Sequence, residues 1–111
     1  MSEIREAIEQ YLQHCFATET PPRVSDLAER LGMTREKVSR DFAAATGVAL
    51  SDYLKAQQLA LAQNLLASSK LSTTRIGYLS CFGTRRTFFR AFRRGTGMSP
   101  DEYRRASSAH S

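Results

Sequence analysis

The 111-residue chain contains no tryptophan, only three prolines and only two cysteines, and it has no long hydrophobic run. Two cysteines are a poor basis for a disulfide scaffold, and with only two histidines they are too few for a zinc site. No apolar stretch approaches the roughly 18 residues of a membrane span, and the charged first residues exclude a secretory signal. We therefore expect a soluble, cytoplasmic protein without a metal, a cofactor or a membrane partner.

Acidic residues are scarce in the second half of the chain. Residues 1–55 hold seven Lys and Arg against nine Asp and Glu, a formal charge of −2, whereas residues 56–111 hold nine against two, or +7. The segment FGTRRTFFRAFRRGTG, residues 82–97, has five arginines, four phenylalanines and no acid. A basic helix of this kind indicates a negatively charged partner, either nucleic acid or an acidic surface.

Helical periodicity runs through the whole sequence, and no strand pattern is present. The expected helices cover residues 3–17, 25–31, 34–45, 51–68, 73–80, 84–95 and 99–106. Ser25, Thr34 and Ser51 are expected as N-caps, and Gly32 as the left-handed residue that ends the second helix. The sequence therefore predicts an all-α fold of seven helices.

Short turns inside two helix pairs predict two helix-turn-helix units, each part of a homeodomain-like three-helix subdomain. We expect the first subdomain at residues 1–50, the second at 69–106 and a frayed tail at 107–111. The long central helix at 51–68 joins them, and at about 1.5 Å per residue it spans roughly 27 Å. Its only charges are Asp52 and Lys55, so we expect it to pack on more than one side.

The second half of the chain repeats the first. From the second helix of each unit onward, a shift of 50 residues pairs similar side chains: Val38 with Phe88, Arg40 with Arg90, Phe42 with Phe92, Thr46 with Thr96, Gly47 with Gly97, Val48 with Met98 and Tyr53 with Tyr103. Upstream the shift is 49, and the pairs are Leu27 with Ile76, Ala28 with Gly77 and Met33 with Phe82. The second unit therefore has one extra residue at its turn.

A helical projection separates the core side of each second helix from its outward side. Steps of about 100° per residue from an inward Val38 or Phe88 define the two outward faces. The outward residues are Glu36, Arg40 and Ala43 in the first unit and Arg86, Arg90 and Arg93 in the second. An α-helix fits the major groove of B-DNA, where arginine can contact guanine with two hydrogen bonds. Two such helices could reach successive major-groove segments, ~34 Å apart, and because their faces differ we expect an asymmetric site.

The segments LAERLGMTREKVSRDFAAATGVALSDYL, LALAQNLL and RIGYLSCFGTRRTFFRAFRRGTGMSPDEYRR resemble the DNA-binding domain of AraC/XylS-type transcription regulators. The resemblance covers residues 24–105, about three-quarters of the chain. It implies a seven-helix fold, promoter binding on double-stranded DNA and, for an activator, RNA polymerase as a partner. By position it implies base contacts from Glu36, Ser39, Arg40, Arg85, Arg86, Thr87 and Arg90.

Phosphate contacts are expected around the start of each second helix and along its basic flanks, because helix N-termini and cations attract phosphate. The residues are Thr34, Arg35, Lys37, Thr84, Arg93 and Arg94. We expect a monomeric DNA-binding region that joins the bacterial nucleoid when bound to DNA. Family members usually carry a second domain, so the sequence is either a free-standing small regulator or a fragment of a longer one.

The sequence departs from the family pattern at four places. Gly77 follows Ile76 where alanine is usual, and Gln58 stands where arginine is common. Cys81 replaces the turn glycine. It either adopts a left-handed conformation, at a cost in stability of about 1 kcal/mol, or the turn changes shape. Gly83 is close enough to accommodate the change. Phe89 replaces a small polar residue; it meets a thymine methyl or another partner, or it folds back onto the domain edge.

Two other functions are considered. Adjacent His14 and Cys15 diverge by about 100° on a helix and do not form a nucleophile–base pair, so no enzyme is predicted. The alternative to DNA binding is a helical interaction module whose basic helix docks on an acidic partner. Steep weakening of binding by salt would indicate contacts with several phosphates.

Overall fold

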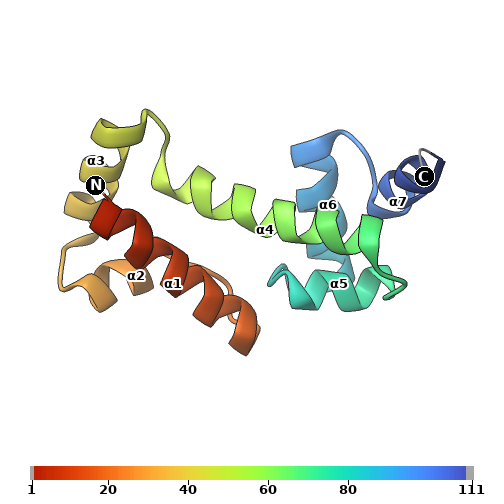
Figure 1. Cartoon of the computed structure of the whole chain (residues 1–111), viewed down its shortest axis with the longest axis horizontal. Helices are drawn as coiled ribbons and strands as arrows, with labels where there is room; N and C mark the ends of the chain where they lie inside the picture. Colours follow the sequence, from red (N-terminus) through yellow and green to blue (C-terminus); the bar gives the residue numbers. More distant parts are fainter. Residues whose placement is uncertain (1, 110–111) are drawn as a thin grey trace. The chain divides into compact units, whose positions relative to one another are not determined.

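The computed structural model describes residues 2–109, which form seven α-helices and no strand (Figure 1). The helices are α1 (Ser2–Thr18), α2 (Val24–Leu31), α3 (Arg35–Thr46), α4 (Leu50–Ser68), α5 (Thr73–Leu79), α6 (Arg85–Thr96) and α7 (Pro100–Ala109). The predicted all-α fold of seven helices is confirmed. The chain divides into two compact units, residues 1–55 and 56–111, and the boundary lies within α4 where the charge balance of the sequence changes sign.

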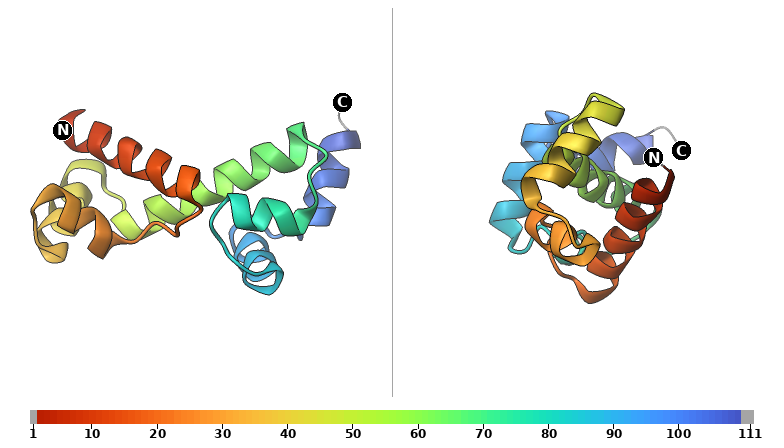
Figure 2. Two further views of the ribbon diagram at one scale, coloured as in Figure 1. Left: turned by 90° about the horizontal axis from the view of Figure 1, so that it is seen from below. Right: turned by 90° about the vertical axis from the view of Figure 1, so that its left-hand side faces the viewer.

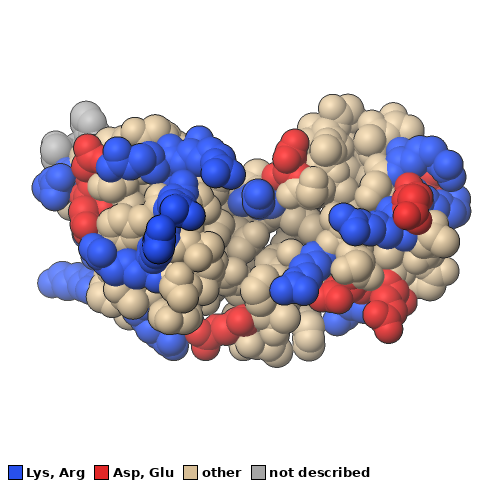
Figure 3. Space-filling view, turned by 180° about the vertical axis from the view of Figure 1, so that it is seen from behind, with Lys and Arg blue, Asp and Glu red and all other residues tan. Residues whose placement is uncertain are grey.

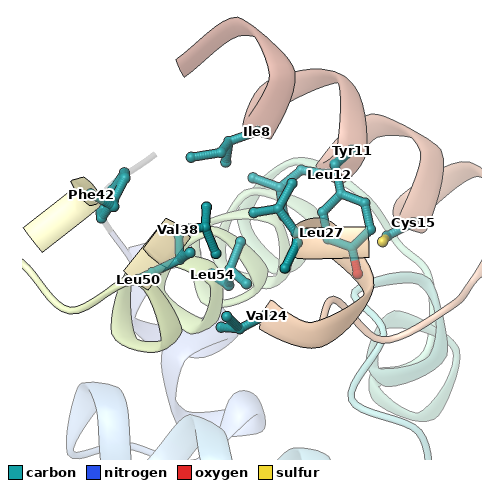
Figure 4. Packing of buried hydrophobic residues seen from close by; sticks show 11 residues of the cluster. Ile8, Tyr11, Leu12, Cys15, Val24, Leu27, Val38, Phe42, Leu50 and Leu54 are labelled. Atoms are coloured by element: carbon teal, nitrogen blue, oxygen red, sulfur yellow. The ribbon is translucent and has the colours of Figure 1, made fainter. Parts of the chain in front are cut away.

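The N-terminal unit consists of α1, α2, α3 and the first residues of α4. Its core receives apolar side chains from all four segments (Figure 4): Ile8, Tyr11, Leu12, Cys15, Val24, Leu27, Val38, Phe42, Leu50 and Leu54. Val38 and Phe42 are buried on one side of α3, as the projection predicted. The opposite side of α3 therefore faces away from this core.

The prediction that Ser25 caps α2 is wrong, because α2 begins one residue earlier, at Val24. Its N-cap is Arg23, which is extended and makes no side-chain capping bond. The Tyr11 hydroxyl accepts a hydrogen bond from the Arg23 amide at 2.8 Å and donates one to the Arg23 carbonyl at 3.1 Å. Burial raises the pKa of Tyr11 to about 12, so this hydroxyl keeps its proton at neutral pH. A tertiary contact from α1 thus sets the start of α2.

The prediction that Ser51 caps the long helix is also wrong, because α4 begins at Leu50. Ser51 is exposed within the first turn, whereas Leu50 is buried in the N-terminal core. The Tyr53 amide donates to the Ala49 carbonyl at 3.0 Å, so the helical bonding starts before Ser51. Burial of Leu50 in helical conformation accounts for the earlier start.

The C-terminal unit consists of the remainder of α4 with α5, α6 and α7 (Figure 2). Ala62, Leu66, Ile76, Phe88 and Phe92 form its core. Phe92 contacts Phe88 at 5.6 Å and Tyr103 at 5.5 Å between ring centroids, in both cases edge to face. This aromatic series joins α6 to α7 and fixes which side of α6 is buried.

A reciprocal pair of hydrogen bonds starts α7. The Glu102 amide donates to the Ser99 hydroxyl at 3.1 Å, and the Ser99 amide donates to a Glu102 carboxylate oxygen at 2.9 Å. Arg104 then donates to the carbonyls of Leu66 and Ser69 at 3.2 Å each, which ties α7 to the end of α4. The helix extends to Ala109, so residues 107–109 of the expected tail are helical and residues 110–111 lie outside the described part. No helix in residues 2–109 has the length and apolar character needed to cross a membrane.

Candidate nucleic-acid interface

In the N-terminal unit, α2 and α3 form a helix-turn-helix whose turn depends on one glycine. Gly32 ends α2 with φ 67°, in the left-handed region, and its amide donates to the carbonyl of Glu29 at 3.2 Å. Thr34 then caps α3, because its hydroxyl accepts a hydrogen bond from the Lys37 amide at 3.1 Å. The predicted roles of Gly32 and Thr34 are confirmed.

In the C-terminal unit, α5 and α6 form the second helix-turn-helix, and its turn is built differently. Cys81 takes the left-handed conformation with φ 68°, and the extra residue of this turn, Gly83, takes it again with φ 84°. Thr84 caps α6 by accepting from the Thr87 amide at 3.3 Å. Of the alternatives left open for Cys81, the left-handed conformation is the one adopted, with Gly83 as a second left-handed residue.

Gln58 of α4 supports this strained turn. Its side-chain amide donates to the carbonyls of Ser80 and Cys81 at 3.2 and 3.1 Å, and the side chain is only 7% exposed. The sequence marked Gln58 only as a departure from the family pattern. The two carbonyls that Gln58 supports are 22 and 23 residues away in the sequence, so local residue spacing could not predict these hydrogen bonds.

Gly77 is explained by the size of Phe88. A Cβ atom added at Gly77 would lie 2.9 Å from a ring carbon of Phe88, which is closer than real Cβ contacts allow. The aligned residues of the N-terminal unit are Ala28 on α2 and Val38 on α3, both in its core; Ala28 is larger than Gly77, and Val38 is smaller than Phe88. Compared with the N-terminal unit, the C-terminal unit therefore has less side-chain volume on the first helix of the pair and more on the second.

The outward side of α6 is strongly basic. Arg85, Arg86, Thr87, Arg90, Arg93 and Arg94 are all exposed, while Phe88 and Phe92 on the other side are 0% exposed. Arg86, Arg90 and Arg94 form no ion pair within the described residues. In Figure 3 the Lys and Arg side chains gather over the C-terminal unit, drawn at the left. The predicted base-facing residues of α6 are thus all accessible in the structure.

The outward side of α3 is mixed in charge. Glu36 and Arg40 are exposed, and Ser39 is half-buried beside them. Lys37 forms an ion pair with Asp41, with 3.1 Å between Nζ and Oδ2. This pair offsets one of the cations predicted to contact phosphate, so α3 presents a weaker positive field than α6.

The residues predicted to contact phosphate lie at the helix starts and at the end of α6. Thr34, Arg35, Lys37 and Thr84 are exposed in or next to the first turns of α3 and α6. Arg93 lies near Glu102 of α7, with 3.5 Å between Nη2 and Oε1. Hydrogen bonds from Ser99, first from its backbone amide, and the nearby Arg93 lower the pKa of Glu102, so this carboxylate stays charged beside the basic helix.

Phe89 folds against its own domain. The ring packs on the C-terminal core and meets Phe88 edge to face at 6.0 Å, and the guanidinium of Arg85 lies over it. Of the alternatives left open for Phe89, packing on the domain edge is therefore the one seen in the structure. The half-buried ring remains next to the exposed arginines of α6.

A family model described as a helix-turn-helix domain, of the AraC/XylS type, matches residues 27–106 of the chain. The chain belongs to this family. Family and fold are those of DNA-binding transcription regulators and not of enzymes, and the resemblance noted in the sequence is confirmed. The match includes both helix-turn-helix units described above.

Two curated regulators are similar in sequence to this family member. An HTH-type transcriptional regulator of Mycobacterium tuberculosis is 32% identical over 84 residues, which are 76% of this chain and 32% of the relative. The Msm operon regulatory protein of Streptococcus mutans is 29% identical over 83 residues, 75% of this chain and 30% of the relative. The aligned part of the chain thus spans about a third of the length of these relatives.

Solved structures of the same fold include one bound to DNA. The DNA-binding domain of AdpA, a global transcriptional factor solved with a target DNA, has a TM-score of 0.84 and 31% identity, covering 96% of this chain and 94% of its own. The C-terminal domain of AraT, a response regulator from Geobacillus stearothermophilus, has a TM-score of 0.83 and 28% identity, covering 93% and 84%. Both likenesses extend across the two units.

The residues considered for catalysis do not form a reactive site. Cys15 is buried and His14 is exposed on α1. Burial raises the pKa of the Cys15 thiol, which disfavours the reactive thiolate. Within residues 2–109 there is no group of three or more His, Cys, Asp or Glu that could hold a metal ion, and His110 lies outside the described residues.

Proposed function

We propose that this protein is a sequence-specific transcription regulator that inserts α3 and α6 into successive major-groove segments of a promoter. The observation that carries the proposal is the outward face of α6, where Arg86 and Arg90 are exposed, unpaired within the described residues and backed by a buried aromatic core. Cations on a rigid helix suit groove recognition because the backbone positions from which they project are set before DNA is bound.

Each base-facing residue has a proposed role. Arg86 and Arg90 donate to guanine, Arg85 joins them from the first turn, and Thr87 contacts a neighbouring base. In α3, Arg40 makes the main contact, with Glu36 accepting from cytosine and Ser39 beside it. Because α3 and α6 present different side chains, the bound site is asymmetric and one monomer reads both halves.

Phosphate contacts hold the protein in register. Thr34 and Thr84 place the starts of α3 and α6 near the backbone of the duplex, and the exposed cations Arg35, Lys37, Arg93 and Arg94 flank them. These contacts are the same for every DNA sequence. We propose that they supply most of the salt-dependent affinity.

The wider role follows the family. We propose that the protein acts in the bacterial cytoplasm, associates with the nucleoid through DNA and contacts RNA polymerase at the promoters it activates. The AdpA domain, similar over nearly its whole length, was solved with a target DNA, which supports the DNA-binding part of this role.

In vitro selection of bound DNA from a random duplex pool tests the proposal. We expect an asymmetric motif with two conserved segments about one helical turn apart, and steep weakening of binding between 50 and 200 mM salt. Recovery of no sequence preference, or binding that salt leaves unchanged, would contradict it. Binding to an acidic protein without DNA binding would favour the interaction module considered from the sequence.

A further inference from the structure

Arg85 and Phe89 lie one helical turn apart on α6 and contact each other. The guanidinium carbon of Arg85 lies 4.2 Å from the centroid of the Phe89 ring, well within the ~6 Å range of a cation–π interaction. Arg85 is exposed and Phe89 is half-buried. The aromatic ring therefore forms a partly buried platform under an exposed cation.

The platform is itself held in place by the core. Phe89 packs on the C-terminal core and meets the fully buried Phe88 edge to face, with 6.0 Å between centroids. Phe88 in turn contacts Phe82 and Phe92. Because the ring is fixed by these contacts, the arginine that lies over it has fewer orientations available.

The N-terminal unit has no such arrangement. The shift of 50 residues pairs Arg35 with Arg85 and Ser39 with Phe89, so a small polar side chain stands where α6 has the ring. The cation–π contacts among the described residues are those of Arg30 with Tyr11 and of Arg85 with Phe89, and neither involves α3. Of the two helices proposed to contact DNA, only α6 therefore has an arginine lying over an aromatic ring.

We propose that Phe89 is a positioning residue that holds Arg85 ready for a two-pronged contact with one guanine. The inference rests on the proposed function and deepens it. Cation–π attraction acts through the charge and the ring face, so the N–H donors of the guanidinium stay free for the O6 and N7 acceptors of guanine. Restriction before binding reduces the side-chain entropy that is lost on the DNA.

A double-mutant cycle tests this role on the selected DNA site and on a scrambled duplex. Phe89→Leu keeps an apolar side chain but removes the ring, and we expect affinity for the selected site to fall about threefold, in line with an exposed cation–π pair. In an Arg85→Ala background the same change has no further effect, because there is no cation left to position. Phe89→Tyr, which keeps the ring, retains binding, and the scrambled duplex responds little to either change at Phe89.

A matched cycle between Phe89→Leu and Arg94→Ala serves as control. Arg94 has no ring contact with Phe89, so the two effects should add. In the free protein, NMR should show ring-current shifts of the Arg85 side-chain protons that are lost in Phe89→Leu and kept in Phe89→Tyr. Thermal unfolding checks the fold of each variant, and Phe89→Met is the second ring-free variant if leucine disturbs packing.

Two results would overturn the positioning role. One is an equal effect of Phe89→Leu with and without Arg85, and the other is the absence of any effect on the selected site. Either would leave the proposed function standing, provided that selection had returned a motif. Absence of a motif would instead contradict the proposed function, and the NMR shifts would then report on the Arg85–Phe89 contact independently of DNA.

Discussion

The two helix-turn-helix units share their frame and differ in their outward charge. Thr34 and Thr84 cap the second helices in the same way, and Gly47 and Gly97 end them in the same left-handed conformation. Yet α3 has three basic and two acidic residues, a net charge of +1, whereas α6 has five basic residues and no acid, or +5. The comparison shows that capping and core positions set the fold, while the outward positions are available for a different binding task in each unit.

The interiors of the units also differ while serving the same purpose. The aligned core residues are Ala28 on α2 and Val38 on α3 in the N-terminal unit, and Gly77 on α5 and Phe88 on α6 in the C-terminal unit, where the glycine lies directly against the ring. The large ring of Phe88 takes the space that a Cβ atom on α5 would need. Packing thus requires a matched pair of residues at this contact, and either division of volume is accepted.

The largest effect on stability is expected when the Gly77 and Phe88 pair of the C-terminal unit is replaced by the residues of the N-terminal unit. Phe88→Val should destabilise the C-terminal unit by about 2 to 4 kcal/mol because it leaves a cavity, and Gly77→Ala by about 1 to 3 kcal/mol because it overpacks. The double change recreates the Ala–Val pair of the N-terminal unit, so its effect should be smaller than the sum. Chemical denaturation, with hydrogen exchange of the α5 and α6 amides, measures this coupling. Strict additivity would show that Gly77 and Phe88 are not a matched pair.

The next effect concerns the outward arginines. Arg90→Ala should weaken binding to the selected site by about 1 to 3 kcal/mol and relax specificity at one base pair. Arg40→Ala, the corresponding change in α3, should have a smaller effect because α3 is closer to neutral. Arg94→Ala should weaken all duplexes about equally and reduce the salt dependence.

Binding titrations and repeated selection measure these changes. Recovery of the unaltered motif at full strength with Arg90→Ala would contradict the role of Arg90. An effect of Arg40→Ala larger than that of Arg90→Ala would reverse the ranking of the two helices.

A smaller effect is expected at the two turns. Gln58→Met removes both donors that support the C-terminal turn and should destabilise this unit by about 1 to 2 kcal/mol, because buried carbonyls lose their partners. Gly32→Ala should cost the N-terminal unit about 1 kcal/mol, which is purely conformational since a Cβ atom there meets nothing within 4 Å. Gln57→Met is the matched control on α4. Amide hydrogen exchange reports on the stability of each unit separately. If either substitution reduced the protection of both units equally, the two turns would not be independent.

The smallest effect is a pH dependence of stability at the start of α7. The N-terminal unit has Ala49 at the position that corresponds to Ser99, and alanine has no hydroxyl group to form the reciprocal hydrogen bonds. Hydrogen bonding from Ser99, mainly from its backbone amide, lowers the pKa of Glu102. Its contribution to stability is therefore fully present above the unfolded-state pKa of about 4.3 and is lost as pH falls through the lower folded-state value. Thermal melts from pH 6 to pH 2 should show a shallower acid decline in Glu102→Gln than in the parent protein. Identical slopes would indicate that this carboxylate is not coupled to folding.

Most of the helices were predictable because their signals are local. The cap Thr34, the left-handed Gly32 and the inward Val38 and Phe88 follow from side-chain chemistry and a 3.6-residue period. The same period separated the arginines of α6 from its phenylalanines. Apart from the half-buried Ser39, the exposure of the candidate contact residues was thus readable from the sequence, while their contacts with DNA stay a prediction.

The errors arose where distant residues decide. Ser25 and Ser51 have good capping chemistry, but the helices start earlier because Tyr11 holds Arg23 and because Leu50 is buried. The brace from Gln58 to the C-terminal turn was missed for the same reason. Local propensity is a weak preference that one buried contact can override.

The order of residues by itself determined the seven helices, the internal repeat and the concentration of positive charge in the second half, because each depends on neighbours along the chain. Only the tertiary structure decided how the two turns are supported, why Gly77 faces Phe88 and where Phe89 places Arg85. Those features depend on volumes and hydrogen-bonding groups brought together from separate helices, and the linear spacing of residues does not contain that information.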